Sequence, residues 1–354
     1  MHSFTYTGLP ARVIFGFGTR TRLGEEVDAL GLRRVLLLST PAQKNVAAEL
    51  VETLGDLCVG TFGGAVMHTP VAVTEEALRI VRDLGADGTV AIGGGSTTGL
   101  GKAIALRTDL PQIVLPTTYA GSEMTPVVGQ TEAGRKTTQR SLKVLPETVI
   151  YDVELTMTLP ARLSGTSGIN AIAHAVEAFY AQDANPVVSL LAEEGIAALA
   201  RSLPRIVKNG ADRDSRSEAL YGAWLCGICL ASVGMALHHK LCHVLGGSFD
   251  LPHSETHTII LPHAVAYNAK AAPEAIARAA RALGADDAAS ALFDLAGAVG
   301  AKRALRDIGM PRDGIEKAAD IAVANPYFNP RPIERNAIRD LLARAWAGET
   351  PVMS

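Results

Sequence analysis

The chain has few of the residues that would mark several specialised classes of protein. It holds only 4 cysteines in 354 residues, too few and too unevenly placed for a disulfide framework. Lys and Arg total 33 against 36 Asp and Glu and are scattered, so no basic stripe is available to neutralise the phosphates of a nucleic acid. Apolar runs are too short to span a bilayer, and the opening MHSFTYTGLP lacks a charged start followed by an apolar run. We therefore expect a cytoplasmic protein with neither nucleic acid nor a membrane as partner.

Two of the cysteines, Cys226 and Cys229, form a C-x-x-C motif. They lie in AWLCGICLASVGMAL, where small and large apolar residues recur at helical spacing. No second pair of cysteines offers the partners of a tetrahedral zinc site. The motif therefore predicts a buried helix in preference to redox or zinc chemistry.

The organisation of the chain changes near residue 160. Before it, helical segments alternate with five β-rich runs, at 12–15, 34–39, 88–94, 112–116 and 148–152. This alternation is typical of a mostly parallel sheet, which binds ligands at the carboxyl ends of its strands. After it, the strand signals stop and Ala-rich and Leu-rich helical patterns take over. We predict an α/β, Rossmann-like dinucleotide-binding domain at 1–158 and an all-α catalytic domain at 159–354.

The most specific signal of the first half is VAIGGGSTTGLGKAIAL, residues 90–106. A strand runs directly into three glycines, and a helix follows. Without side chains, the backbone N–H groups approach an anion closely, and the start of the helix favours negative charge. The pattern matches neither G-x-G-x-x-G nor GxxxxGK[ST]. We predict that Gly93, Gly94, Gly95 and Ser96 bind the pyrophosphate of a dinucleotide, the alternative being a tight strand-to-helix turn.

Two further strand ends complete the predicted cofactor site. The loop LPTTYAGSEMT, residues 115–125, offers hydroxyls to a ribose or base from Thr117, Thr118 and Ser122. The strand VLLLS ends in Ser39, where dinucleotide folds often place a carboxylate that binds the ribose 2′-OH. Without a carboxylate there to repel a 2′-phosphate, the sequence predicts that NADH and NADPH are both accepted.

The second half concentrates imidazoles. Five of the 9 histidines lie in HHKLCHVLGGSFDLPHSETH, residues 238–257. Residues four apart share a helix face, which pairs His239 with His243 and, earlier in the chain, Asn170 with His174. His253 follows a loop with two glycines and a proline. Imidazoles converging from two helices and a turn bind a divalent cation or transfer protons. His238 and His257 look dispensable, since the first lies off the shared face and the second lies beyond the turn.

The segments IGGGS, PTTYAGSE, DVELTMTLP, GINAIAHAVEAF and HHKLCHVLGGSFDLPHSETHTIILPH together resemble the iron-containing alcohol dehydrogenase family over essentially the whole chain. TTYAGSEMTP, HHKLCHVLGG and NPYFNPRPI resemble its maleylacetate reductase branch. The resemblance implies the two-domain, dehydroquinate synthase-like fold, a homodimer, NADH or NADPH as cofactor, and a role in aromatic compound degradation. The implied reaction is reduction of the carbon–carbon double bond of the dicarboxylate maleylacetate to 3-oxoadipate.

In the metal-dependent members an aspartate and three histidines bind iron or zinc. Carried over, the histidines are His174, His239 and His253, but the aspartate position holds Asn170. His243 falls where the family keeps a histidine near the nicotinamide. An amide offers a metal a dipole in place of its only anionic ligand, so the resemblance implies a vestigial site and a reaction without metal.

The resemblance thus implies His243 and then His253 as proton donors or enolate stabilisers, with His174 and His239 shaping the pocket. Candidates for the substrate carboxylates are Arg140, Lys240, Arg331 and Tyr327. The alternatives are a metal-dependent alcohol dehydrogenase, a lyase resembling dehydroquinate synthase, and a non-catalytic nucleotide-binding regulator.

Overall fold

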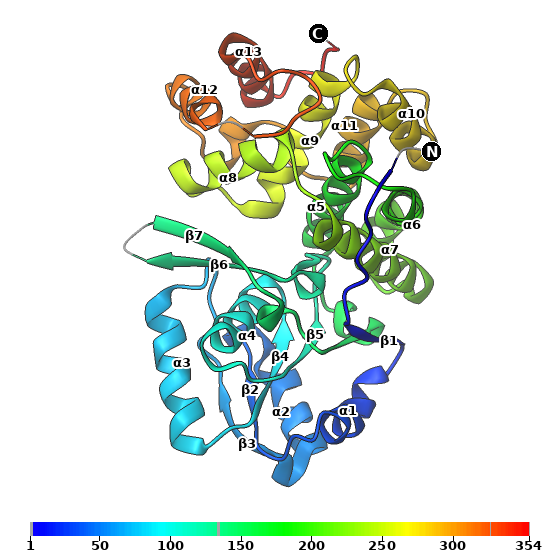
Figure 1. Cartoon of the computed structure of the whole chain (residues 1–354). Helices are drawn as coiled ribbons and strands as arrows, with labels where there is room; N and C mark the ends of the chain where they lie inside the picture. Colours follow the sequence, from blue (N-terminus) through cyan, green and yellow to red (C-terminus); the bar gives the residue numbers. More distant parts are fainter. Residues whose placement is uncertain (1–2, 133–134, 326, 354) are drawn as a thin grey trace. The chain divides into compact units, whose positions relative to one another are not determined.

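The computed structural model describes residues 3–132, 135–325 and 327–353 (Figure 1). By internal contacts, Leu9–Leu159 form one compact unit, and Pro160–Ser354 with the segment before Leu9 form the other. The two are called here the sheet unit and the helical unit. In the described part of the chain no single helix is long and apolar enough to cross a membrane. Only the pair α7 Arg213–Ser232 and α8 Leu237–Phe249, which meet at 94°, passes that test by length and composition.

A six-stranded parallel sheet with the order β1-β8-β5-β4-β2-β3 organises the sheet unit. The predicted strands appear as β1 Arg12–Gly16, β2 Val35–Leu38, β4 Gly88–Gly93, β5 Gln112–Pro116 and β8 Thr148–Asp152. The edge strand β3 Cys58–Phe62 was not predicted, because CVGTF has only a short β-branched pattern. The antiparallel hairpin β6 Val127–Glu132 and β7 Arg135–Arg140 was also missed.

Helices cover both faces of this sheet (Figure 1). Alternate strand residues point to opposite faces, so Leu37 and Val90 pack against α1 Leu23–Ala29 and α2 Lys44–Leu54. The intervening residues pack against α3 Val71–Leu84 and α4 Gly95–Thr108 on the other face. Strands buried on both sides explain the continuous apolar runs in the sequence.

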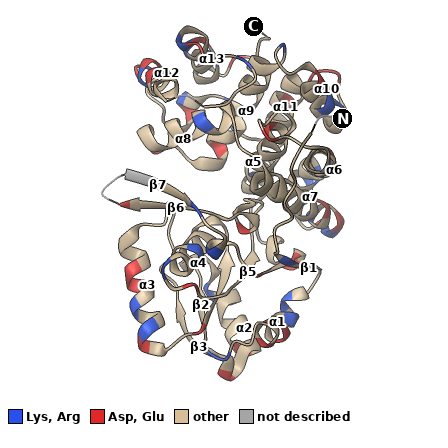
Figure 2. Cartoon of the chain, in the orientation of Figure 1, with Lys and Arg blue, Asp and Glu red and all other residues tan. Residues whose placement is uncertain are grey.

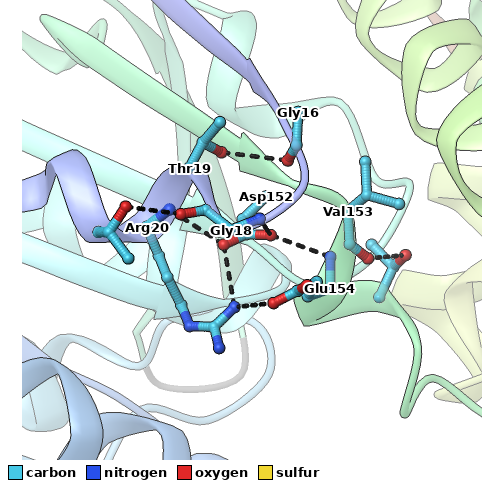
Figure 3. A network of polar contacts seen from close by, with 9 residues as sticks. Gly16, Gly18, Thr19, Arg20, Asp152, Val153 and Glu154 are labelled. Atoms are coloured by element: carbon cyan, nitrogen blue, oxygen red, sulfur yellow. Dashed lines mark hydrogen bonds and ion pairs between the residues drawn. The ribbon is translucent and has the colours of Figure 1, made fainter.

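Asp152, at the end of β8, holds the turn after β1 (Figure 3). One carboxylate oxygen accepts hydrogen bonds from the backbone N–H of Gly18 at 2.9 Å and of Glu154 at 3.0 Å. The other accepts from the backbone N–H and the guanidinium of Arg20, at 3.0 and 3.1 Å. Because Asp152 is fully buried, these bonds replace all its contacts with water.

The helical unit consists mainly of nine helices among its described residues: α5 Ala161–Phe179, α6 Pro186–Lys208, α7 Arg213–Ser232, α8 Leu237–Phe249, α9 His253–Asn268, α10 Pro273–Leu283, α11 Ala288–Ala298, α12 Gly314–Ala324 and α13 Arg335–Ala347. Polar residues cap several of them; Asn185, for example, accepts from the N–H of Val188 at 3.1 Å ahead of Pro186. Every residue of α5 from Ser164 to Phe179 is buried, which makes this helix the centre of the unit.

Small residues let the neighbours of α5 approach closely. A Cβ added at Gly165 would lie 2.6 Å from Val299 Cβ, and one added at Gly168 would lie 2.5 Å from Leu203 Cδ2. Cys226 and Cys229 are free and buried in α7, as a core helix requires. A second core joins α8, α9, α12 and α13. In Figure 2, Lys and Arg alternate with Asp and Glu along the outer helices of each unit.

We expect Asp152→Asn to lower the free energy of unfolding by about 2–4 kcal/mol, because an amide leaves buried donors unpaired and removes the charge opposite Arg20. Urea denaturation of the two proteins measures this difference. Asp28→Asn is the matched control, since Asp28 is an exposed partner of Arg33. An Asp152 variant as stable as this control would contradict the structural role.

Candidate active site

The predicted cofactor residues of the sheet unit follow three adjacent strands. Ser39 follows β2, the glycines follow β4, and Thr117 follows β5; these strands lie side by side in the order β5-β4-β2. Their loops are joined directly. The N–H of Thr117 donates to Gly93 O at 2.9 Å, and Gln43 Nε2, from the loop after β2, donates to Thr117 Oγ1 at 3.4 Å. The parallel sheet thus brings the predicted residues to one edge.

Gly93, Gly94 and Gly95 form a turn whose backbone conformation and close contacts leave little room for side chains at the first two positions. Gly93 has φ 144°, and a Cβ there would lie 2.7 Å from Thr97 Oγ1. Gly94 is the N-cap of α4 and receives no side-chain cap, while a Cβ at Gly95 would meet nothing within 4 Å. The hydroxyls of Thr97 and Thr98 donate to Gly94 O. The first N–H groups of α4 therefore have the arrangement that suits a phosphate, beside exposed Gly95.

A fully buried lysine supports the loop after β5, and sequence reasoning missed it. Lys102 Nζ donates to Thr125 Oγ1 at 2.8 Å and to the carbonyl oxygens of Ser122, Thr125 and Val127 at 2.5 to 2.9 Å. Burial lowers the pKa of Lys102 to about 7, against the opposing effect of Glu123. Glu123 is buried, which raises its pKa, and it accepts from Tyr151 Oη at 2.8 Å. Lys102 thereby fixes the backbone that carries Ser122.

In the helical unit, imidazoles from three helices meet. His174 comes from α5, His238, His239 and His243 come from α8, and His253 and His257 come from α9. His174 Nδ1 lies 2.8 Å from His239 Nε2, and the ring centroids of His239 and His257 are 5.1 Å apart. The structure thus brings together the four histidines singled out from the sequence, with two more. We call these six the histidine cluster.

Glu177, which sequence reasoning did not select, orders this cluster. It is fully buried on α5, seven residues after Asn170 and three after His174. One carboxylate oxygen accepts from His239 Nδ1 at 2.7 Å and from Ala236 N at 2.8 Å; the other accepts from His238 N at 2.7 Å. The helix spacing of Asn170, His174 and Glu177 on one face was the signal in the sequence.

These bonds decide which nitrogen of His239 carries a proton. A carboxylate only accepts, so the proton lies on Nδ1. In a neutral His239, Nε2 then accepts from His174 Nδ1, which leaves His174 Nε2 as an acceptor. Glu177 therefore fixes the tautomers of two histidines in sequence, as carboxylates do behind functional imidazoles.

His238 and His257 form a second hydrogen-bonded pair, His238 Nε2 to His257 Nδ1 at 2.9 Å. Burial lowers the pKa of both well below the ordinary value, so both rings are neutral. With Cys242 they form the group of possible metal ligands in the described residues, with ligand atoms within 4.8 Å of one another. Burial raises the pKa of the Cys242 thiol well above its ordinary value, which disfavours the thiolate that a metal needs.

The two histidines expected to act on substrate are exposed within this unit. His243, one turn beyond His239 on α8, has its ring centroid 6.3 Å from that of His239. His253 lies 4.3 Å from the ring of His257. Exposed rings above a buried, ordered layer suit proton exchange with a ligand.

Two expectations about this region need correction. Gly246 and Gly247 lie inside α8, so the loop before His253 is only Asp250–Pro252, and His253 begins α9 instead of standing in a turn. His238 and His257, which looked dispensable, are fully buried and hydrogen-bonded within the cluster. The reason is that α9 starts early enough to place His257 one turn after His253, facing α8.

The candidates for substrate carboxylates are dispersed. Lys240 Nζ lies 5.3 Å from the centroid of the Tyr327 ring, and Tyr327 Oη is buried without a hydrogen-bond partner in the described residues. Arg331 lies over the ring of Tyr267, and Arg140 ends β7 in the other unit. Lys240 and Tyr327 are thus the pair beside the histidine cluster.

The sequence and the fold are those of a known class of dehydrogenase. Residues 10–153 match the family model of iron-containing alcohol dehydrogenases, and residues 164–346 match the C-terminal model of the same family. The chain belongs to the iron-containing alcohol dehydrogenase family.

Within that family its close relatives are maleylacetate reductases. It is 58% identical to one from Sphingobium indicum, with 99% of each chain covered, and 54% identical to one from Rhizobium sp., with 99% of this chain and 100% of the relative covered. The structure of maleylacetate reductase from Agrobacterium tumefaciens matches with a TM-score of 0.96 at 54% identity, over 99% of this chain and 100% of the other. A putative alcohol dehydrogenase from Ralstonia eutropha matches with a TM-score of 0.98 at 58% identity, over the same shares.

The family name raises the question of whether the residues present fit iron. The four positions that correspond to the family's metal ligands by resemblance are Asn170, His174, His239 and His253. They offer three imidazoles and one amide, and Asn170 Oδ1 is buried without a partner in the described part of the chain. His239 Nε2, the nitrogen opposite Glu177, is engaged with His174. Non-haem iron(II) sites usually include a carboxylate, which is missing from these four positions. The set therefore fits iron poorly.

We expect Glu177→Gln to lower the free energy of unfolding by about 1–3 kcal/mol and to reduce turnover, because its amide NH₂ opposes one of three buried donors and releases His239 from its tautomer. Urea denaturation and steady-state assays measure the two effects. Glu255→Gln removes a surface pair with Arg162 and serves as control. If Glu177→Gln matched this control in both measurements, Glu177 would not order the site.

Proposed function

We propose that this chain reduces the carbon–carbon double bond of maleylacetate with NADH or NADPH, giving 3-oxoadipate in aromatic compound degradation. The observation that carries the proposal is its identity of 50–58% to several maleylacetate reductases over nearly its whole length. The family and these relatives make the chain an NAD(P)H-dependent oxidoreductase acting on a small molecule.

The sheet unit is proposed to bind the dinucleotide. The pyrophosphate would lie against the N–H groups of Gly94, Gly95 and Ser96, the arrangement being supported by the uncapped start of α4. Thr117, Thr118 and Ser122 would bind the remainder, on a loop held by Lys102. Ser39 leaves the ribose 2′ position without a carboxylate, which supports the use of both NADH and NADPH.

The helical unit is proposed to manage charge and protons. When bound, the nicotinamide supplies a hydride to the alkene carbon beta to the ketone, and the electron pair of the double bond moves to the ketone oxygen as an enolate. His243 donates a proton to the carbon next to the ketone or a hydrogen bond to its oxygen, with His253 as second donor. Glu177 fixes the tautomers of His239 and His174, so the two imidazoles present the same hydrogen-bonding groups to the pocket throughout the reaction.

An enolate intermediate would make a metal dispensable. Reduction of an isolated carbonyl forms an alkoxide, a much stronger base, for which a cation is a more valuable stabiliser. The negative charge of an enolate needs less stabilisation, and hydrogen bonds from imidazoles supply it. The replacement of the family's aspartate by Asn170 supports a reaction without metal, with His174, His239 and His253 retained as polar groups. A homodimer is proposed from the family resemblance, and a cytoplasmic location is proposed from the sequence.

We expect oxidation of NADH and NADPH with maleylacetate to exceed oxidation with simple aldehydes by several decades and to persist within about two-fold after chelation, because no step needs a cation. A spectrophotometric assay at 340 nm, with metal analysis of the same sample, measures this. Stoichiometric iron or zinc with chelator-sensitive reduction of aldehydes would instead identify a metal-dependent alcohol dehydrogenase. Turnover without net NAD(P)H consumption would identify a lyase.

We expect His243→Ala to lower the turnover number by about two decades or more, since it removes a group that transfers a proton in the transition state. The affinity for NADH, measured by fluorescence titration on the same variant, separates a loss of proton transfer from a loss of cofactor binding. A variant with near-normal turnover would transfer the role to His253.

A further inference from the structure

The helical unit contains a cavity of about 240 Å³ apart from the histidine cluster. Its polar lining comes from α9, from α13 and from the segment between α12 and α13: His263, Tyr267, Arg331, Asp340 and Arg344. His263 lies six residues beyond His257 on α9, about 9 Å along the helix axis at 1.5 Å per residue. This cavity therefore differs from the pocket assigned to substrate.

The charge of the lining is mainly positive. Arg344, in the last turn of α13, is half-buried and forms no ion pair with any described residue. The guanidinium carbon of Arg331 lies 4.1 Å from the centroid of the Tyr267 ring, and Nη1 donates to Tyr267 O at 3.3 Å, so its plane is fixed. The carboxylate, Asp340, is exposed and bound by Arg339 at 2.7 Å. The lining thus holds two guanidiniums, of which Arg331 already has partners, and one carboxylate that is paired with Arg339.

A buried polar atom also lacks a partner here. His263 is 3% exposed, and its Nε2 has no hydrogen-bond partner among the described residues. Burial and then the charge of Arg344 lower the pKa of His263 to about 4, so the ring is neutral near pH 7. A buried nitrogen of this kind costs free energy unless a ligand or water satisfies it. In one tautomer it donates a hydrogen bond to an acceptor oxygen.

We propose that this cavity is a binding site for a small oxyanion, a carboxylate or a phosphate, held by Arg344 and Arg331 with a hydrogen bond from His263 Nε2. The volume limits the ligand, since pockets for drug-sized molecules start at about 300 Å³ and a water occupies about 30 Å³. A phosphate or a small dicarboxylate fits that size, and a nucleotide does not. Guanidiniums favour such ligands because they bind two oxygens at once.

Hydrogen bonds of the segment 327–332 connect this cavity to the start of α8. Asn329 Nδ2 donates to Arg331 O and to Asn268 Oδ1, each at 2.7 Å, and Asn329 Oδ1 accepts from Leu237 N at the start of α8 at 3.4 Å. Tyr327, beside Lys240, begins the same segment. The anion would therefore lie at one end of a segment whose other residues contact Leu237 and Lys240 of α8, the helix that carries His239.

Isothermal titration of the full-length protein with sodium phosphate and, separately, with sodium succinate tests the proposal. We expect saturable binding at a site whose affinity falls at least about ten-fold in Arg344→Met, because a charge-assisted hydrogen bond is removed, while binding at the proposed cofactor and substrate sites is unchanged by this substitution. Arg281→Met, which removes an exposed arginine of α10 outside the cavity, should bind within about two-fold of the parent protein. The titration that reaches saturation, with phosphate or with succinate, shows which class of anion the site prefers.

Binding of neither anion up to about 20 mM, or equal binding by the Arg344 and Arg281 variants, would overturn the proposal. Arginine modification by phenylglyoxal gives a second test that needs no variant. A saturating anion should slow modification of Arg344 at least about five-fold and leave Arg281 unchanged, as measured by peptide mass spectrometry. Equal rates at Arg344 with and without the anion would show that the cavity does not bind it.

Discussion

The helical unit depends on one buried carboxylate. In the last turn of α5, Glu177 accepts hydrogen bonds from the N–H groups of Ala236 and His238 at the start of α8 and from His239 Nδ1. A carboxylate without these partners would cost several kcal/mol to bury, so the fold and the orientation of the imidazoles stabilise each other. The position of α8, the tautomer of His239 and the bond to His174 all follow from it.

In the sheet unit, the parallel sheet brings the short polar loops after β2, β4 and β5 together. Parallel strands end at one edge, and hydrogen bonds across that edge join the loops after β2, β4 and β5. Gly93 takes a backbone conformation that other residues rarely adopt, and Lys102 fixes the loop after β5 from beneath. These supports are rigid, which is what precise binding of a dinucleotide requires.

The charge of the site lies behind its imidazoles. Asn170, His174, His239 and His253 include no anionic side chain, while Glu177 places its charge behind His239. The site thus has polarised imidazoles without an anionic metal ligand. Such an arrangement suits the stabilisation of an enolate better than that of an alkoxide.

The amino-acid sequence was enough to predict the class of the fold, five of the six strands of the parallel sheet, the glycine turn and the four histidines. Each of these follows from local pattern: apolar periodicity, the special conformations of glycine, and side chains four residues apart on a helix. Only the tertiary structure decided the roles of Glu177, His238, His257 and Lys102. A buried polar residue in an apolar helix looks the same in sequence whether it has partners or not, and its partners here lie 59 residues or more away for Glu177 and 20 or more away for Lys102. The short edge strand β3 and the early start of α9 were likewise decided by packing, because pairing with β2 and contact with α8 outweigh weak local preferences.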